Sequence, residues 1–257
     1  MSALFRVQGI ILGRHDHKEV DRWYSVFTKE HGRIDFLAKG GHKPLAKLTP
    51  HLETIAEVDL LLINGRHYEI IANVERLKAY TKIHKDLQKL ILAQNALSLV
   101  ALGTHPYETD PVLYEVLTHW LGFLEKLSTV SQERSAYLLG VFAIKLLAIF
   151  GYRPELHGCL QCKKGIEQGE YLWHALKGGV ICKKCVCDHK EQYFSARSMT
   201  DENLKLIRFA LAESFEEQLK PHLSGESLMN FHEAIESLII SHFPSIPAIS
   251  LRGSCIV

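Results

Sequence analysis

The sequence predicts a multidomain α+β protein, in which a small N-terminal β-barrel of five strands precedes an all-helical domain with an inserted four-cysteine zinc element. Three observations support this. Apolar and polar residues alternate in short segments up to residue 80, and apolar residues then recur with helical spacing. Five of the six cysteines lie between residues 156 and 190. We expect the barrel over 1–80, helices over 81–155, the zinc insert over 156–190 and further helices over 191–257.

Short alternating segments predict four of the five strands, at residues 5–11, 34–38, 56–62 and 70–74. The run at 23–28 is dense in aromatic and β-branched residues and predicts the remaining strand. Turn-forming residues at Glu30-His31-Gly32 and at Asn64-Gly65 separate neighbouring segments. A sheet this small has to close or be covered to protect its edges, so five strands suit a compact barrel.

Helical spacing predicts five main helices in the rest of the chain. They lie at about residues 87–100, 110–128, 131–150, 201–215 and 227–242. Asp110-Pro111 predicts an N-cap followed by proline at the first helical position, and Thr200 predicts a second N-cap. Residues 131–150 are apolar on nearly all sides, which indicates a helix buried among other helices.

Composition excludes several classes of protein. With 257 residues, 47% hydrophobic and 23% charged, the chain is neither disordered, collagenous nor a coiled coil. A net charge of +1 favours no particular partner. The longest apolar run, residues 136–150, is too short to span a bilayer and contains Lys145. The N-terminal residues lack the layout of a signal peptide, so we expect a cytoplasmic protein.

Two paired cysteine motifs are the most specific local pattern. Nineteen residues separate Cys159-x2-Cys162 from Cys182-x2-Cys185. Two such turns supply the four thiolates of a tetrahedral Zn²⁺ site, and four thiolates leave no open position for a catalytic water. We therefore expect one structural zinc ion, which would hold together an insert too polar to form its own core.

Other interpretations of the cysteines remain open. A redox pair would need a flanking βαβ pattern, which the sequence lacks, and disulfides conflict with a cytoplasmic setting. Chance spacing is the third alternative. Cys187 and His189 are close enough in sequence to replace one of the four ligands.

Searches for catalytic motifs find none. The chain has no P-loop, no Rossmann glycine motif, no nucleophile elbow and no HExxH zinc motif. We therefore expect a binding protein and not an enzyme, with an unrecognised hydrolase or deaminase as the remaining alternative.

Local clusters of basic residues suggest where nucleic acid could bind. Residues 36–51 carry Lys39, Lys43 and Lys47 without an acidic residue, and Arg14 and Arg22 flank the first turn. A barrel with a basic rim can bind single strands when exposed aromatic residues also stack on bases. The candidates for stacking are Trp23, Tyr24 and Phe27. The alternative is a solvated loop beside core aromatics, since residues 1–80 hold twelve basic and ten acidic residues.

Several pieces of the chain together resemble a known family. They are VQGIILGR at residues 7–14, DRWYSVFTKEHGR at 21–33, KGGHK at 39–43, FAIKLLAIFGYRP at 142–154, and the paired cysteine motifs. In this combination the chain resembles the bacterial RecO family of DNA repair and recombination-mediator proteins over essentially its whole length. One difference is Gly41-His42-Lys43, where family members often carry adjacent arginines.

The resemblance implies an oligonucleotide-binding (OB) barrel, a helical domain and a four-cysteine zinc element. It implies a non-enzymatic protein that binds single- and double-stranded DNA, anneals complementary strands and helps load recombinase onto strands coated by single-strand binding protein. The implied partners are RecR, the acidic C-terminal tail of single-strand binding protein and, indirectly, the RecA filament, and the implied place of action is the nucleoid. The positions that match the family's basic barrel surface are Arg14, Arg22, Arg33, Lys39 and Lys43.

Lys145 matches a basic position in the family's helical domain. It is the one cation inside the apolar run of residues 131–150, so it either extends to the surface or pairs with an anion. We expect a hydrophobic recess between 110–128 and 131–150, where Lys145 would bind the acidic tail. The alternative function is a zinc-stabilised scaffold for proteins, with only incidental contact to nucleic acid.

Overall fold

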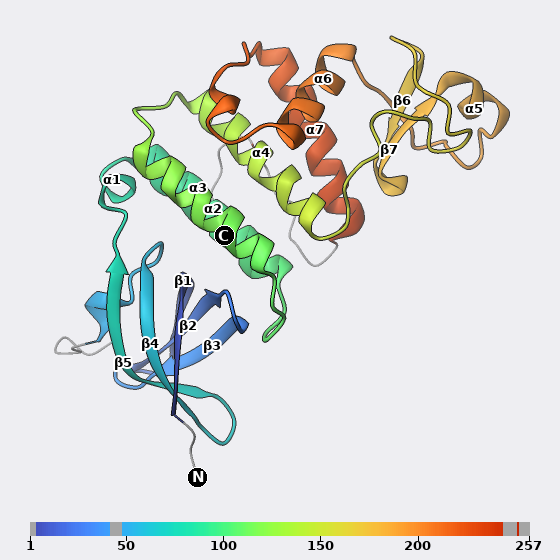
Figure 1. Ribbon diagram of the computed structural model, residues 1–257. Coiled ribbons are helices and arrows are strands. Elements are labelled where there is room, and N and C mark those ends of the chain that lie inside the picture. The colour runs from blue at the N-terminus through green and yellow to red at the C-terminus, as the bar shows by residue number, and fades with distance from the viewer. Residues whose placement is uncertain (1–3, 42–47, 244–250, 252–257) are drawn as a thin grey trace. The chain divides into compact units, whose positions relative to one another are not determined.

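The computed structural model describes residues 4–41, 48–243 and 251 (Figure 1). Contacts divide the chain into two compact units, Met1–Thr129 and Val130–Val257, and each is described here by itself. The boundaries expected at residues 80, 155 and 190 were placed where the sequence pattern changes, and not from contacts between residues. The division into four parts therefore stays a prediction.

Five strands of the first unit form the closed barrel that the sequence predicts. They are β1 (Leu4–His17), β2 (Asp21–Thr28), β3 (Gly32–Ala38), β4 (Glu57–Asn64) and β5 (Glu69–Lys78), hydrogen-bonded in the order β1-β2-β3-β5-β4. The long strand β1 pairs with β4 through its first half and with β2 through its second half, and a bulge lies between Ile11 and Gly13. Among these five pairs of barrel strands, β3 and β5 run parallel and the other four pairs are antiparallel. This is the expected OB-type barrel.

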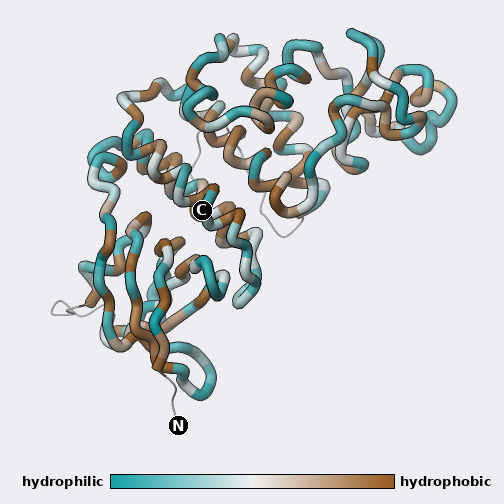
Figure 2. Tube along the Cα trace, viewed as in Figure 1, coloured by the Kyte–Doolittle hydropathy of each residue, from teal (hydrophilic) through white to brown (hydrophobic). Residues whose placement is uncertain are grey.

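Alternating side chains fill the inside of the barrel. Tyr24, Val26 and Phe36 belong to this core and are fully buried. In Figure 2, hydrophobic stretches run along the barrel strands. Gly9 allows β1 and β2 to approach closely, because a Cβ there would lie 2.5 Å from the Phe27 carbonyl oxygen. The inner face of the strands therefore forms the core. A ligand can bind only to the outer wall, the loops or the open ends of the barrel.

Three helices complete the first unit. They are α1 (Thr81–His84), α2 (Leu87–Gly103) and α3 (Pro111–Lys126), and a short 3₁₀ turn at Thr49–His51 (η1) precedes β4. As predicted, the Asp110 carboxylate caps α3 by accepting a hydrogen bond from the Leu113 N–H. Helix α2 packs against β1, and the Tyr114 ring of α3 lies 6.4 Å from that of Phe27 on β2.

The second unit is built on three helices, α4 (Gln132–Ile149), α6 (Asp201–Ala212) and α7 (Gly225–His242). Helix α4 is buried along most of its length and packs against both others, as its apolar sequence predicts. Gly140 lets α4 and α7 approach, because a Cβ there would lie 2.7 Å from the Phe231 ring. Within the described residues, no helix is long and apolar enough to cross a membrane.

The cysteine-rich insert lies between α4 and α6. It contains β6 (Tyr171–His174), η2 (Ala175–Lys177), β7 (Gly179–Cys182), α5 (Lys183–Asp188) and β8 (Arg197–Ser198), and η3 (Glu217–Leu219) follows α6. The strands form a small sheet in the order β7-β6-β8. In Figure 1 this sheet and α5 lie together at one end of the second unit.

Candidate metal centre and nucleic-acid interface

The four predicted cysteines come together in the second unit. The sulfur atoms of Cys159, Cys162, Cys182 and Cys185 all lie within 4.8 Å of one another, and those of Cys162 and Cys182 are 3.9 Å apart. With metal–sulfur bonds of about 2.3 Å, a tetrahedral site places its sulfurs about 3.8 Å apart. The spacing of these atoms therefore fits a tetrahedral metal ion.

Two tight turns position the sulfurs. In the first, the Cys159 N–H donates to the Lys164 carbonyl at 2.8 Å, and Lys163 adopts the left-handed conformation with φ 61°. In the second, Cys182 ends β7 and is the N-cap residue of α5, so that Cys185 lies in the first helical turn. The Cys182 N–H points to the Cys159 sulfur at 3.4 Å, which joins the two turns.

The electrostatics of the cluster also fit a cation. Burial opposes ionisation of Cys159, but the backbone N–H groups of Cys162, Cys182 and Gln161 lower the pKa of its thiol to about 6. Burial raises the pKa of Cys182, and the contact with Cys182 raises the pKa of Cys185 to about 12. Cys159 is therefore the thiol that ionises most readily, while burial and sulfur–sulfur contacts oppose ionisation of Cys182 and Cys185. A bound cation would favour the ionised form of all four thiols.

The insert has a small buried cluster of its own, besides other buried side chains such as Leu156, Trp173 and Val180. Its buried cluster contains Cys159, Cys185, Ile181 and Tyr193, so two of its four members are themselves metal-ligand candidates. Cys187 is exposed and, like His189, lies outside the four-sulfur cluster of the described residues. The sixth cysteine, Cys255, lies outside the described residues.

Three cations predicted to bind DNA gather at one end of the barrel. Arg14 lies opposite Tyr24 in the β1–β2 pair, and Arg22 lies opposite Ala38 in the β2–β3 pair, just before the exposed Lys39. The Arg22 Nε donates to Asp16 at 2.7 Å and the side chain is 12% exposed, so Asp16 shares its charge. Arg14 is exposed.

The start of the basic loop is anchored to the barrel. The Gly40 N–H donates to the Asp21 carboxylate at 2.8 Å, which ties the end of β3 to the start of β2. Lys43 and Lys47 lie outside the described residues. The predicted cations of the loop therefore begin, at Lys39, at the same barrel end as Arg14 and Arg22.

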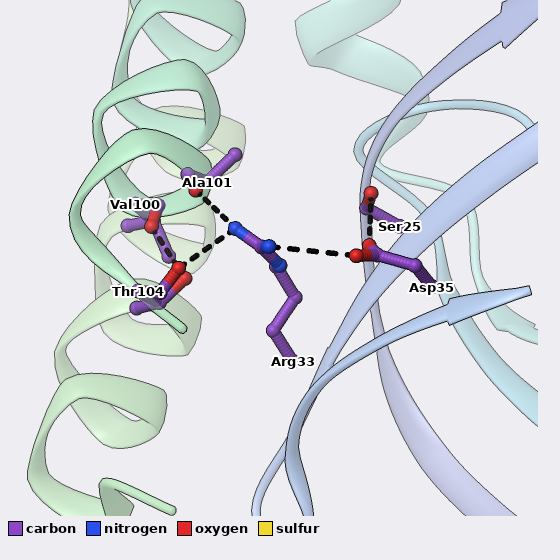
Figure 3. Close-up of polar contacts among 6 residues, drawn as sticks. All are labelled: Ser25, Arg33, Asp35, Val100, Ala101 and Thr104. Carbon is purple, nitrogen blue, oxygen red and sulfur yellow. Dashed lines mark hydrogen bonds and ion pairs between the residues drawn. The ribbon is translucent and has the colours of Figure 1, made fainter. Parts of the chain in front are cut away.

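Arg33 has a structural role that the sequence did not reveal. One guanidinium nitrogen donates to the carbonyls of Ala101 at 2.6 Å and Thr104 at 2.7 Å, at the C-terminal end of α2 (Figure 3). The other lies 3.4 Å from Asp35. These carbonyls have no helical partner and carry partial negative charge, so a cation is favourable there. We therefore leave Arg33 out of the proposed DNA surface.

The three candidate stacking residues have different positions. Tyr24 faces the barrel core and Phe27 is covered on the outer wall, and both are fully buried. Trp23 is half-buried and lies among other rings, with centroids 6.5 Å from His15, 6.0 Å from His17 and 5.2 Å from Tyr68. The sequence did not reveal the part of His15, His17 and Tyr68, because only the folded β1–β2 pair and the turn before β5 bring them beside Trp23.

Lys145 lies in the buried helix α4. Its Nζ donates to the Glu213 carbonyl at 2.7 Å and lies 5.7 Å from the centroid of the Phe215 ring. Burial lowers the pKa of Lys145, and the nearby charge of Arg153 adds to this effect. The ammonium thus has an intramolecular acceptor, and its role in binding a partner stays a prediction.

Comparison with known proteins assigns both halves of the chain to one family. The N-terminal model of recombination protein O matches residues 1–80, and the C-terminal model matches 84–239. A protein named DNA repair protein RecO from Dehalococcoides mccartyi strain BAV1 is 28% identical over 235 residues, 91% of this chain and 89% of its own. One from Alkaliphilus metalliredigens is 24% identical over 249 residues, 97% and 98% of the two chains.

Proposed function

Because the chain belongs to the recombination protein O family, we propose that it is a DNA-binding mediator of recombinational repair that catalyses no covalent reaction. It would bind single- and double-stranded DNA, anneal complementary strands and help load recombinase onto strands coated by single-strand binding protein. The observation that carries the proposal is a closed barrel with Arg14, Arg22 and Lys39 at one end. Acting on chromosomal DNA would place the protein in the cytoplasm, at the nucleoid.

In this proposal the barrel end supplies the contact to phosphates. Arg14 and Lys39 present exposed charges, while Arg22 shares its charge with Asp16. The rest of the loop would add Lys43 and Lys47. Each phosphate neutralised in this way releases condensed counterion, so the affinity should fall steeply with salt.

The metal of the four-cysteine cluster would be Zn²⁺ in a structural role. Four thiolates at tetrahedral spacing are typical of structural zinc. When bound, the ion would supply a cross-link between the turn at Cys159–Cys162 and the start of α5. With four protein ligands it would have no open position, which agrees with a non-enzymatic function.

The proposed protein partners are RecR, the acidic C-terminal tail of single-strand binding protein and, indirectly, the RecA filament. For the acidic tail, Lys145 is the residue to test. Lys145→Ala should weaken binding of a tail peptide by about 1–3 kcal/mol, the range for losing one charge-assisted hydrogen bond, and should leave binding to naked oligonucleotide nearly unchanged. A fluorescence titration with labelled peptide measures this.

Because Lys145 also bonds to Glu213, its variant should be compared with wild type in urea unfolding. Equal peptide affinity in a folded variant would remove Lys145 from the tail-binding site.

The alternative function is a zinc-stabilised scaffold for proteins. In that role Phe194 and Leu176, which are 82% and 63% exposed, would supply apolar contacts to a protein partner. A strand-annealing assay separates the two functions. The mediator should accelerate pairing of complementary oligonucleotides coated with single-strand binding protein, whereas a scaffold should leave the rate unchanged and show no salt-dependent binding to oligonucleotides.

A further inference from the structure

We propose that Trp23 and the rings around it form a stacking site for unpaired bases on the outer wall of the barrel. This inference rests on the proposed DNA-binding function and deepens it, because it names which part of the DNA the wall recognises. The cluster consists of Trp23, His15, His17 and Tyr68, and we call it the ring cluster.

Strand register places two of these rings, His15 and Trp23, in one row across the sheet. His15 of β1 lies opposite Trp23 of β2, Trp23 lies opposite Leu37 of β3, and Leu37 lies opposite Ile70 of β5. Since the neighbouring Tyr24 belongs to the barrel core, the Trp23 side chain points to the outer wall. Tyr68 enters from the turn just before β5.

The two ends of the outer wall on β2 differ in what covers them. Phe27 is fully buried and its ring faces that of Tyr114 on α3. Trp23 remains half-buried, Tyr68 is 37% exposed and His15 is exposed. Exposed ring surface that is gathered in one place marks a binding site more often than apolar residues scattered singly over a surface. The exposed part of the ring cluster is therefore suited to an external flat, aromatic ligand.

Charges around the ring cluster favour nucleic acid as that ligand. Arg14, Lys18 and Arg66 are exposed and make no ion pair with another residue in the described part of the chain. Lys18 follows His17 in sequence and Arg66 belongs to the same turn as Tyr68, whereas Arg14, opposite the core residue Tyr24, lies on the other face of the strand at the barrel end. Of the nearby carboxylates, Asp16 pairs with Arg22, Glu69 accepts a hydrogen bond from the Tyr107 hydroxyl, and Glu19 is exposed. Aromatic rings between cations are what a single strand requires, because bases stack while phosphates are neutralised.

The ring cluster should prefer single strands to duplex. In a duplex both faces of each base are stacked on neighbouring base pairs, so a ring fixed on a strand wall cannot reach them without unstacking. Arg14, Arg22 and Lys39 have no such restriction, because phosphates are exposed in both forms. The barrel end would then supply affinity for any DNA, and the ring cluster would add affinity for unpaired bases.

Tryptophan fluorescence of the full-length protein reports on this site directly. Of the three tryptophans, Trp120 and Trp173 are 0% and 4% exposed, so Trp23 is the one that a base can quench. Titration with oligothymidylate should quench the wild-type emission. Trp23→Phe should abolish the quenching but keep affinity within a few fold, since phenylalanine also stacks. Trp23→Ala should lose single-strand affinity by about 5- to 150-fold, the range for one base–aromatic stack, with duplex affinity nearly unchanged.

Two further variants control for folding and for unspecific effects. Tyr68→Ala, at an exposed turn, should also weaken single-strand binding, and Phe194→Ala, an exposed ring in the second unit, should not. Wild-type single-strand affinity in both Trp23→Ala and Tyr68→Ala, or wild-type binding without quenching, would overturn the stacking site and leave the proposed function standing. No DNA binding by the wild type would instead contradict the proposed function.

Discussion

Arg33 links the barrel wall to the end of a helix through charge-assisted hydrogen bonds. Removing its side chain leaves the carbonyls of Ala101 and Thr104 without their donor. Hydrogen bonds to a charged group contribute about 1.5–3 kcal/mol. Arg33→Ala should therefore lower the free energy of unfolding by about that amount in urea titrations, while the salt dependence of DNA binding stays the same.

Arg14→Ala is the matched control, since it removes an exposed arginine from the same barrel. It should change the free energy of unfolding by less than about 0.5 kcal/mol and weaken DNA binding instead. The opposite result, a stable Arg33→Ala with a shallower salt slope, would return Arg33 to the DNA surface.

At the scale of single residues, the sequence predicted which side chains can bind a metal better than it predicted which side chains contact one another in the fold. The four cysteines were identified because their spacing alone defines two turns. Trp23, Tyr24 and Phe27 could not be sorted, because β2 carries large apolar residues on both faces and α3 covers Phe27 from outside. The role of Arg33 depends on the end of α2 lying beside β3, and no local sequence pattern predicts that contact.

Among the elements, the cysteine insert is where a single chemical change should have the largest local effect. Cys182→Ser together with Cys185→Ser removes two of four ligands, so bound zinc should be lost. Because the metal would cross-link the two turns that carry the insert's own buried cluster, hydrogen exchange should speed up over residues 156–190 and stay unchanged in the barrel strands. Metal analysis and exchange mass spectrometry measure the two effects.

A single zinc retained in that double variant would contradict the ligand set, and so would zinc-free wild-type protein purified without chelator. Cys187→Ser is the control, since the exposed Cys187 lies outside the cluster, and it should keep its metal.

The sequence predicted the long helices and strands but not the short ones. The barrel strands and the helices with N-caps at Asp110 and Thr200 were predicted because alternation, helical spacing and capping are local. Helix α6 ends at Ala212, before the expected residue 215, because the backbone of Glu213 becomes extended. Strand β8 has two residues and α5 has six, too few to produce a periodic pattern.

In the whole molecule, the grouping of helices with the barrel is a tertiary effect. Gly32, with φ +66°, lies so close to the Glu108 carbonyl that a Cβ would be 1.9 Å from its oxygen. The Tyr107 N–H donates to the Arg33 carbonyl at 2.9 Å. These contacts join β3 to the loop between α2 and α3. Composition placed a boundary near residue 80 because the spacing of apolar residues changes there, whereas contacts continue across it.

The central claim is that the barrel binds DNA through the basic residues at one of its ends. The direct test is the salt dependence of single-strand binding by a variant in which Lys39, Lys43 and Lys47 are all alanine. Each lost phosphate contact should make the slope of log affinity against log salt shallower by roughly 0.7, so the three together should change it by about 2. The control replaces the exposed Lys184, Lys190 and Lys205 of the second unit, which changes the net charge equally.

Fluorescence anisotropy of a labelled oligonucleotide between low and moderate salt provides both slopes. We expect a slope shallower by up to about 2 for the barrel variant and a wild-type slope for the control. A wild-type slope for the barrel variant, with a shallower slope for the control, would place the DNA site in the second unit and contradict DNA binding by the basic end of the barrel.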